Sequence, residues 1–176
     1  MSAVVAALAS ALGSMVASLS SAKSDITQVT EAISKCADYC DRFLQLSDDD
    51  QSAFEAVMSA LRLPKEDPHR ATTLEETVHL AAEIPLMVAQ SCLELLVLLD
   101  SMVPLASRHA VSDIGAAGHF ALAALNASLL NVHINVTFMK NRAEADRFKA
   151  AAARLEKEGR LRCQHIADLV LTSIHS

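Results

Sequence analysis

The sequence has little of what β-structure and long loops require. Its 176 residues include no Trp, one Tyr, five Phe, four Gly and four Pro, and no segment keeps the alternation of apolar and polar residues that marks a half-buried strand. Apolar residues nevertheless make up 52% of the chain, so the core must be built from Ala, Leu, Val, Ile and Met. This composition is typical of helices that pack closely through small side chains.

Positive charge is also scarce. The chain carries 15 Lys and Arg against 21 Asp and Glu, a net charge of −6, and its cations form no run that could follow a phosphate backbone, so nucleic acid is not an expected partner. The four cysteines form no CxxC pair, and nothing near Cys36 and Cys40 supplies the two further ligands of a metal site. We therefore expect no metal, and free thiols in a reducing, cytoplasmic compartment.

Charged side chains are missing altogether from the first 22 residues. Three interpretations of this stretch are open: a signal peptide, a transmembrane helix, or a small-residue helix buried among other helices. The stretch lacks a basic beginning, and Ala and Ser dominate it rather than Leu. These features favour the buried helix, and no membrane partner is expected.

Apolar periodicity and capping residues predict a chain of long helices. After a first helix over 3–20, we expect a second helix to about Leu46 and a third that Ser47 caps and Pro64 ends. A capping box at 73–76 should open a helix that contains Pro85 and ends near Pro104. A helix from 112 to about 142, another that stops at Gly159 and a last one over 161–174 complete the set.

These elements define an all-α fold, an orthogonal or up-and-down bundle of six or seven long helices in a single domain over 1–176. Several of the helices are apolar on more than one face. Such helices need cover on several sides, which indicates an oligomer, most simply a dimer.

Four stretches, in this order, resemble the formimino-tetrahydrofolate cyclodeaminase and methenyl-tetrahydrofolate cyclohydrolase family. They are "VAALASALGSMVASL", "LSDDDQSAFEAVMSALRLPK", "HLAAEIPLMVAQSC" and "SDIGAAGHFALAALNASLLNVHIN". The resemblance spans nearly the whole chain. One departure is that family members usually carry Gly-Gly-Gly-Ser directly before the Val-Ala-Ala-Leu helix, where this chain has only "MSAV".

The resemblance implies an all-helical homodimer that binds a tetrahydrofolate derivative as substrate near the dimer interface, with no metal or redox cofactor. It implies hydrolysis, or loss of ammonia, at an amidine-like carbon of that substrate. A formiminotransferase is a further candidate partner, because the same fold forms the cyclodeaminase half of a bifunctional enzyme. The alternative, which the missing glycine-rich segment motivates, is a non-catalytic folate-binding or interaction protein derived from the same fold.

Candidate catalytic residues are Asp113, Lys65 and Asp50. Asp113 could orient water, take a proton or offset the positive charge of a methenyl substrate, although a carboxylate in a first turn also simply compensates the helix dipole. The resemblance to the family's Ser-Asp pair favours the functional interpretation of Asp113. Asp50 has the same ambiguity beside two other aspartates, and Lys65 could bind the glutamate carboxylate of folate or be an ordinary exposed lysine.

Candidate substrate-binding residues are Asn131 and Asn135. They stand four residues apart, so their side chains share one helix face, where carboxamides could pair with the donor and acceptor edge of a pterin. The structural alternative is an amide pair that fixes helix register. His133 points away from that face and is interpreted as a packing or supporting residue.

Overall fold

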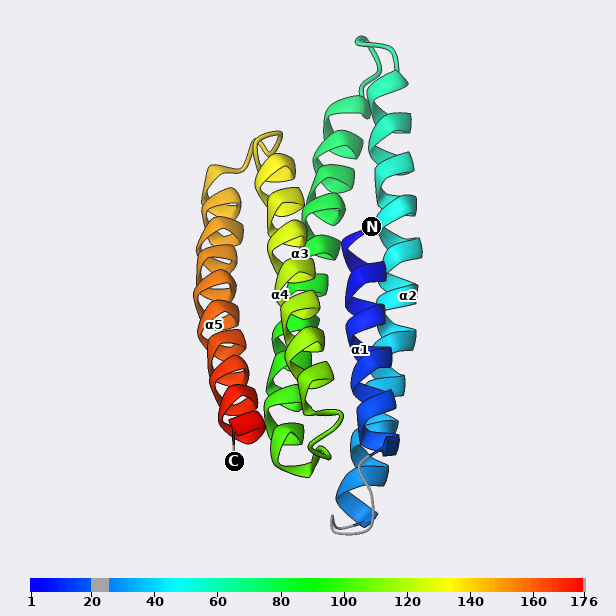
Figure 1. Ribbon diagram of the computed structural model, residues 1–176. Coiled ribbons are helices and arrows are strands. Elements are labelled where there is room, and N and C mark those ends of the chain that lie inside the picture. Colours follow the sequence, from blue (N-terminus) through cyan, green and yellow to red (C-terminus); the bar gives the residue numbers. More distant parts are fainter. Residues whose placement is uncertain (20–25, 176) are drawn as a thin grey trace.

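The computed structural model describes residues 1–19 and 26–175, and every element in these ranges is helical. Five α-helices run up and down (Figure 1): α1 Ser2–Leu19, α2 Ile26–Arg62, α3 Arg70–Met102, α4 Val111–Val136 and α5 Arg142–His175. A short 3₁₀ turn, η1 Val103–Leu105, follows α3 and contains Pro104, where the sequence predicts the helix to end. The predicted all-α fold is therefore confirmed.

The predicted number of six or seven helices is too high, because two breaks read from the sequence do not occur. Ser47 lies inside the continuous helix α2, so Asp48, Asp49 and Asp50 are mid-helix residues and not a first turn. Gly159 lies inside α5 and does not stop it. A Cβ atom at Gly159 would meet Leu125 of α4 at 2.8 Å, so this glycine serves close packing between two helices.

Two predicted caps are also wrong. Helix α3 begins at Arg70, before Thr73, and Asp67 supports its start by accepting a hydrogen bond from the backbone N–H of His69 at 2.8 Å. Helix α4 begins at Val111 after Ala110, so Ser112 does not cap it. In both places a turn outside the predicted motif already supplies the first backbone hydrogen bonds of the helix.

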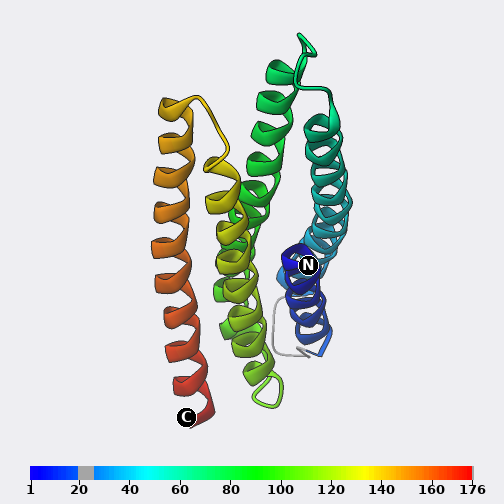
Figure 2. The same ribbon diagram turned by 90° about the horizontal axis from the view of Figure 1, so that it is seen from above.

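Helices α1 to α4 form a four-helix arrangement in which α1 packs against α2 and α4, and α3 lies diagonally opposite α1. Helix α5 packs on α3 and α4 from outside, and Figure 2 shows it on the far side of α4 from α1 and α2. The core of this bundle is rich in alanine and in medium-sized aliphatic residues, with Phe43 as its largest fully buried side chain.

The contacts of α1 depend on small residues. Ser10 donates a hydrogen bond to the carbonyl of Cys36 on α2 at 2.5 Å, and a Cβ atom at Gly13 would lie 3.0 Å from Leu99 and 3.1 Å from the Cys36 sulfur. Seven alanine, serine and glycine residues of α1 are buried: Ala3, Ala6, Ala7, Ala9, Ser10, Gly13 and Ala17. The buried-helix interpretation of the charge-free N-terminal stretch therefore describes α1 in the structure.

Length and hydropathy alone would let two helical segments cross a membrane: Ser2–Leu19 and Arg70–Leu105. Of these windows, 44% and 50% of the residues are buried inside the bundle. The property is weak evidence for a membrane span, because a core helix of a folded domain meets the same criterion.

Candidate functional site

Helix α1 is much shorter than the helices around it, so α2, α3 and α4 continue beyond its start without α1 beside them. In Figure 1, α1 begins about midway along α2 and α3, and these two helices continue beyond it together with the end of α4. Since α1 is antiparallel to α2 and Ser10 contacts Cys36, Ser2 lies level with about residue 44 of α2. We call the place beyond Ser2, between α2, α3 and α4, the open position.

A single seam of α2 serves both α1 and the open position. Its residues are spaced three and four apart, the repeat by which helices pack side by side, and they are Val29, Ile33, Cys36, Cys40, Phe43, Ser47, Asp50, Phe54, Val57 and Leu61. Along the part covered by α1, Cys36 and Phe43 are fully buried. Beyond α1 the same seam is only partly covered, since 64% of Phe54 and 47% of Leu61 are accessible whereas Ser47, Asp50 and Val57 are half-buried.

Asp50 lies on this seam, so the structure places it at the open position. It is half-buried, and among the described residues no cation or hydrogen-bond donor pairs with its carboxylate. Its neighbour Asp49 accepts a hydrogen bond from Gln45 at 3.0 Å, and Asp48 is exposed. Asp50 is therefore the member of the acidic triplet that is available to a bound molecule.

Asn131 and Asn135 approach the open position from α4. The side of α4 that packs on α5 is fixed by Gly118 against Ile166 and by His119, whose Nδ1 lies 3.6 Å from the Cys163 sulfur. Helical spacing places both asparagines away from that side, on the face that also carries the buried residues Ala117, Ala124 and Ser128.

The two asparagines differ in their contacts. Asn131 is exposed, whereas Asn135 is half-buried and donates a short hydrogen bond from Nδ2 to the carbonyl of Ala81 on α3. His133 is exposed, so it does not have the packing role that we expected of it.

The other two candidates lie elsewhere. Lys65 is exposed in the turn between α2 and α3, beyond the end of α2 at Arg62 and about 18 Å further along than Asp50. Asp113 is half-buried in the first turn of α4, 18 residues and about 27 Å from Asn131. Within one chain, the structure places Asp50, Asn131 and Asn135 toward the same end of the bundle, on α2 and α4, two helices that do not pack on each other. Lys65 lies further out at that end, and Asp113 lies at the other end of α4.

One polar residue escapes the sequence reasoning. Ser128 is fully buried, and its Oγ has no hydrogen-bond partner among the described residues. It precedes Asn131 by one turn on the same face of α4. The sequence offered no sign of this, because serine is compatible with any tightly packed helix and only the fold shows that the hydroxyl is left unpaired.

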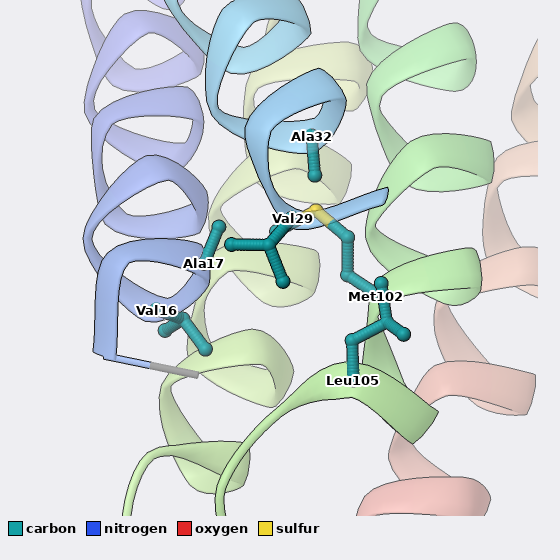
Figure 3. A pocket seen from close by; sticks show the side chains of 6 residues that line it. All are labelled: Val16, Ala17, Val29, Ala32, Met102 and Leu105. Carbon is teal, nitrogen blue, oxygen red and sulfur yellow. The ribbon is translucent and has the colours of Figure 1, made fainter. Parts of the chain in front are cut away.

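The described residues contain a hollow at the opposite end of the bundle, and it is less suited to a polar substrate. Figure 3 shows it between the end of α1, the start of α2 and the end of α3. All six residues that line it are apolar: Val16, Ala17, Val29, Ala32, Met102 and Leu105. An adjoining hollow shares Ala32, Met102 and Leu105 with it and is also lined by the exposed side chains of Gln28, Glu31 and Lys35.

The cysteines are free thiols in the structure, as predicted. Burial raises the pKa of Cys36 to about 11 and also raises the pKa of Cys92 and of Cys163. These three groups are therefore neutral near pH 7 and poor nucleophiles. Within the described ranges, no three His, Cys, Asp or Glu side chains gather as a metal site would require.

The chain and its fold match a known family of proteins. The model of the formiminotransferase-cyclodeaminase family matches residues 1–154, so the chain belongs to that family. The methenyltetrahydrofolate cyclohydrolase of Methylorubrum extorquens is 30% identical over an alignment of 168 residues, and the match covers 90% of this chain and 81% of the relative.

The fold has a close counterpart among solved structures. The crystal structure of formiminotetrahydrofolate cyclodeaminase from Thermotoga maritima superposes with a TM-score of 0.87 at 20% identity. The match covers 97% of this chain and 85% of that one.

Proposed function

We propose that the protein is a folate one-carbon enzyme, a methenyl-tetrahydrofolate cyclohydrolase or a formimino-tetrahydrofolate cyclodeaminase. The observation that carries the proposal is the 30% identity, over 90% of the chain, to a relative named as a cyclohydrolase. The family match over residues 1–154 supports it.

The proposed substrate site is the open position. In the cyclohydrolase reaction, water adds to a cationic amidine-like carbon and one C–N bond of the ring opens, leaving a formyl group on the other nitrogen. In the cyclodeaminase reaction, the neighbouring free amine nitrogen of the substrate attacks the formimino carbon, a new C–N bond closes the ring, and the bond to the departing ammonia breaks. Both reactions need a group that accepts and returns a proton and groups that hold the substrate, and neither step requires a metal or redox cofactor.

Asp50 suits the first of these tasks, because its half-buried carboxylate has no partner among the described residues. It would take a proton from water and offset the positive charge of the methenyl carbon. Asn131 and the free oxygen of Asn135 would hold the pterin. Lys65, at the outer end, would meet the glutamate carboxylate, and Asp113 remains a candidate only for a site that a second chain helps to form.

The test uses purified protein and methenyl-tetrahydrofolate, whose near-ultraviolet absorbance is followed over time. We expect hydrolysis above the spontaneous rate, and a loss of about a hundredfold or more in the Asp50→Asn variant if Asp50 acts as general base. Asp48→Asn changes the same charge two residues away and should keep full activity. Ammonia release from the formimino substrate tests the other reaction.

An unaccelerated rate in both assays would contradict the enzyme proposal. Retained binding of a folate in that case would favour the non-catalytic alternative, a folate-binding protein with the same fold. If the Asp48→Asn and Asp50→Asn variants lost activity equally, the enzyme proposal would stand, but the proposed location of the site at the open position would be wrong.

We further propose that a second copy of the chain covers the outward face of α1 and α4. The exposed apolar residues of this face are Val4, Leu8, Met15, Phe120, Leu130 and Ile134. Apart from Asp113 and histidine, α1 and α4 carry no acidic or basic side chain. An apolar, uncharged face of this extent is unusual on a monomer. Because it adjoins the open position, a homodimer through it would place the substrate near the subunit interface.

Light scattering coupled to size exclusion tests the homodimer. Leu8→Glu should convert the dimer to a monomer, whereas Leu161→Glu on α5 should not, although Leu161 is 64% exposed and Leu8 57%. A monomeric wild-type protein would refute this interface.

A formiminotransferase as substrate donor and a cytoplasmic location also remain proposals, which co-purification and cell fractionation would test.

A further inference from the structure

Pro85 and Asn135 form a pair that the proposed function does not by itself require. Pro85 lies inside α3 and is buried. A proline has no N–H, so α3 cannot make the usual hydrogen bond from position 85 back to the carbonyl of Ala81, and the ring pushes that carbonyl aside. Ala81 is 8% exposed, so water reaches its carbonyl poorly.

Asn135 supplies a donor at this place. Its Nδ2 donates to the Ala81 carbonyl, across 54 positions of sequence and from a different helix. Only the NH₂ end of a carboxamide can donate to a carbonyl, so this contact also fixes which way the amide is turned. The Oδ1 of Asn135 accepts no hydrogen bond from the described residues and is not among their buried, unpaired atoms. The Asn135 oxygen is therefore a hydrogen-bond acceptor whose direction is fixed by the bond from Nδ2 to Ala81.

We propose that Pro85 is a positioning residue for the substrate site. By removing the helical donor, it leaves the Ala81 carbonyl to Asn135, and this holds the Asn135 oxygen ready to accept a hydrogen bond from an N–H group of the substrate. The inference about substrate rests on the proposed folate site. The interdependence of Pro85 and Asn135 does not rest on that site, because it can be measured through the free energy of unfolding alone.

The first experiment is a double-mutant cycle with Pro85→Ala and Asn135→Leu, read by urea unfolding. In the wild-type background, Asn135→Leu removes the donor from a buried carbonyl and should raise the unfolding equilibrium constant about tenfold or more. In the Pro85→Ala background, the new N–H at position 85 can bond Ala81, so the same change should have little effect. Equal effects in both backgrounds would overturn the proposal.

Asn131→Leu is the matched control. It changes the same residue type one turn earlier on the same face, but Asn131 is exposed, so its effect should be the same in the wild-type and Pro85→Ala backgrounds. If Asn135→Leu alone fails to fold, Pro85→Ala should restore folding in the double variant. Failure of that rescue would also overturn the pairing.

The second experiment separates positioning from stability. Pro85→Ala should leave the urea midpoint unchanged or raise it, since Ala favours a helix interior over Pro, while KM for the folate substrate rises severalfold because the Asn135 amide is no longer held. A purely structural proline would change KM only as far as it changes stability. If the protein shows no folate activity, the proposed function fails while the stability cycle still decides the pairing.

Discussion

The bundle has two halves that share α2, α3 and α4, and only one of them contains α1. Where α1 is present, the seam of α2 meets small residues such as Gly13 and Ser10, and Phe43 is fully buried. Beyond α1 the same seam continues with Asp50 and Phe54, and 64% of Phe54 is accessible in the single chain. A short first helix thus turns one regular bundle into a closed half and an open half, and the open half is the site that we propose.

The two phenylalanines of the seam give the largest predicted contrast. Phe43→Ala should lower the free energy of unfolding by about 3–5 kcal/mol, because it leaves a cavity in a closed core. Phe54→Ala, eleven residues further along the same seam, should change it by less than about 0.5 kcal/mol, because 64% of that side chain is already exposed.

Urea unfolding of the two variants makes this measurement. If the protein is a dimer that covers Phe54, the loss of unfolding free energy in Phe54→Ala will depend on protein concentration. The loss in Phe43→Ala, whose side chain is buried within one chain, will then differ from it in this respect too. If Phe43→Ala and Phe54→Ala lowered the free energy of unfolding equally at low protein concentration, the comparison would fail, because the open half would then be as well packed as the closed half.

A second contrast lies within α1. Gly13→Val should cost about 1–3 kcal/mol through overpacking, since a Cβ atom at this position already lies 3.0 Å from Leu99 and 3.1 Å from Cys36. Ala11→Val, on the exposed side of the same helix, should cost only the small difference in helix propensity within one chain. Because Ala11 lies on the proposed dimer face, any further cost should depend on protein concentration, whereas the cost at Gly13 should not. Thermal unfolding followed by circular dichroism compares them, and a tolerated valine at Gly13 would show that α1 is not tightly held.

The smallest predicted effect concerns two cysteines one turn apart on the seam. At pH 8, iodoacetamide should label the half-buried Cys40 before Cys36, because burial raises the pKa of Cys36 to about 11 and keeps it protonated. An unfolded thiol ionises near about 8.5. The stabilising contribution of the protonated Cys36 is therefore complete below that pH and is lost as the pH rises toward 11. Faster labelling of Cys36, read by mass spectrometry, would contradict its close packing under α1.

Much of the fold was predictable from the sequence, because helix periodicity and composition are local properties. The breaks at Ser47 and Gly159 were wrong for a common reason: each residue is a plausible cap, and packing against a neighbouring helix overrides the local preference. The continuous α2 matters for the proposed site, since it moves Asp50 from a helix start to the middle of the seam.

The candidate site was predictable only in part. Spacing alone put Asn131 and Asn135 on one face, but the partner of Asn135 lies 54 residues away on α3 and depends on which turn of that helix faces α4. The distance of Asp113 from the other candidates likewise depends on the direction of α4. Neither property can be read from local sequence, because both are set by how whole helices pair.

The central claim is that substrate binds where α1 leaves the bundle open. Crystals of the protein soaked with a tetrahydrofolate derivative test it most directly. The account predicts that the pterin lies between α2, α3 and α4 beyond Ser2, within hydrogen-bond distance of Asp50 or of the Asn131 and Asn135 amides. A pterin bound beside Asp113 at the other end of α4, with the open position empty, would contradict it.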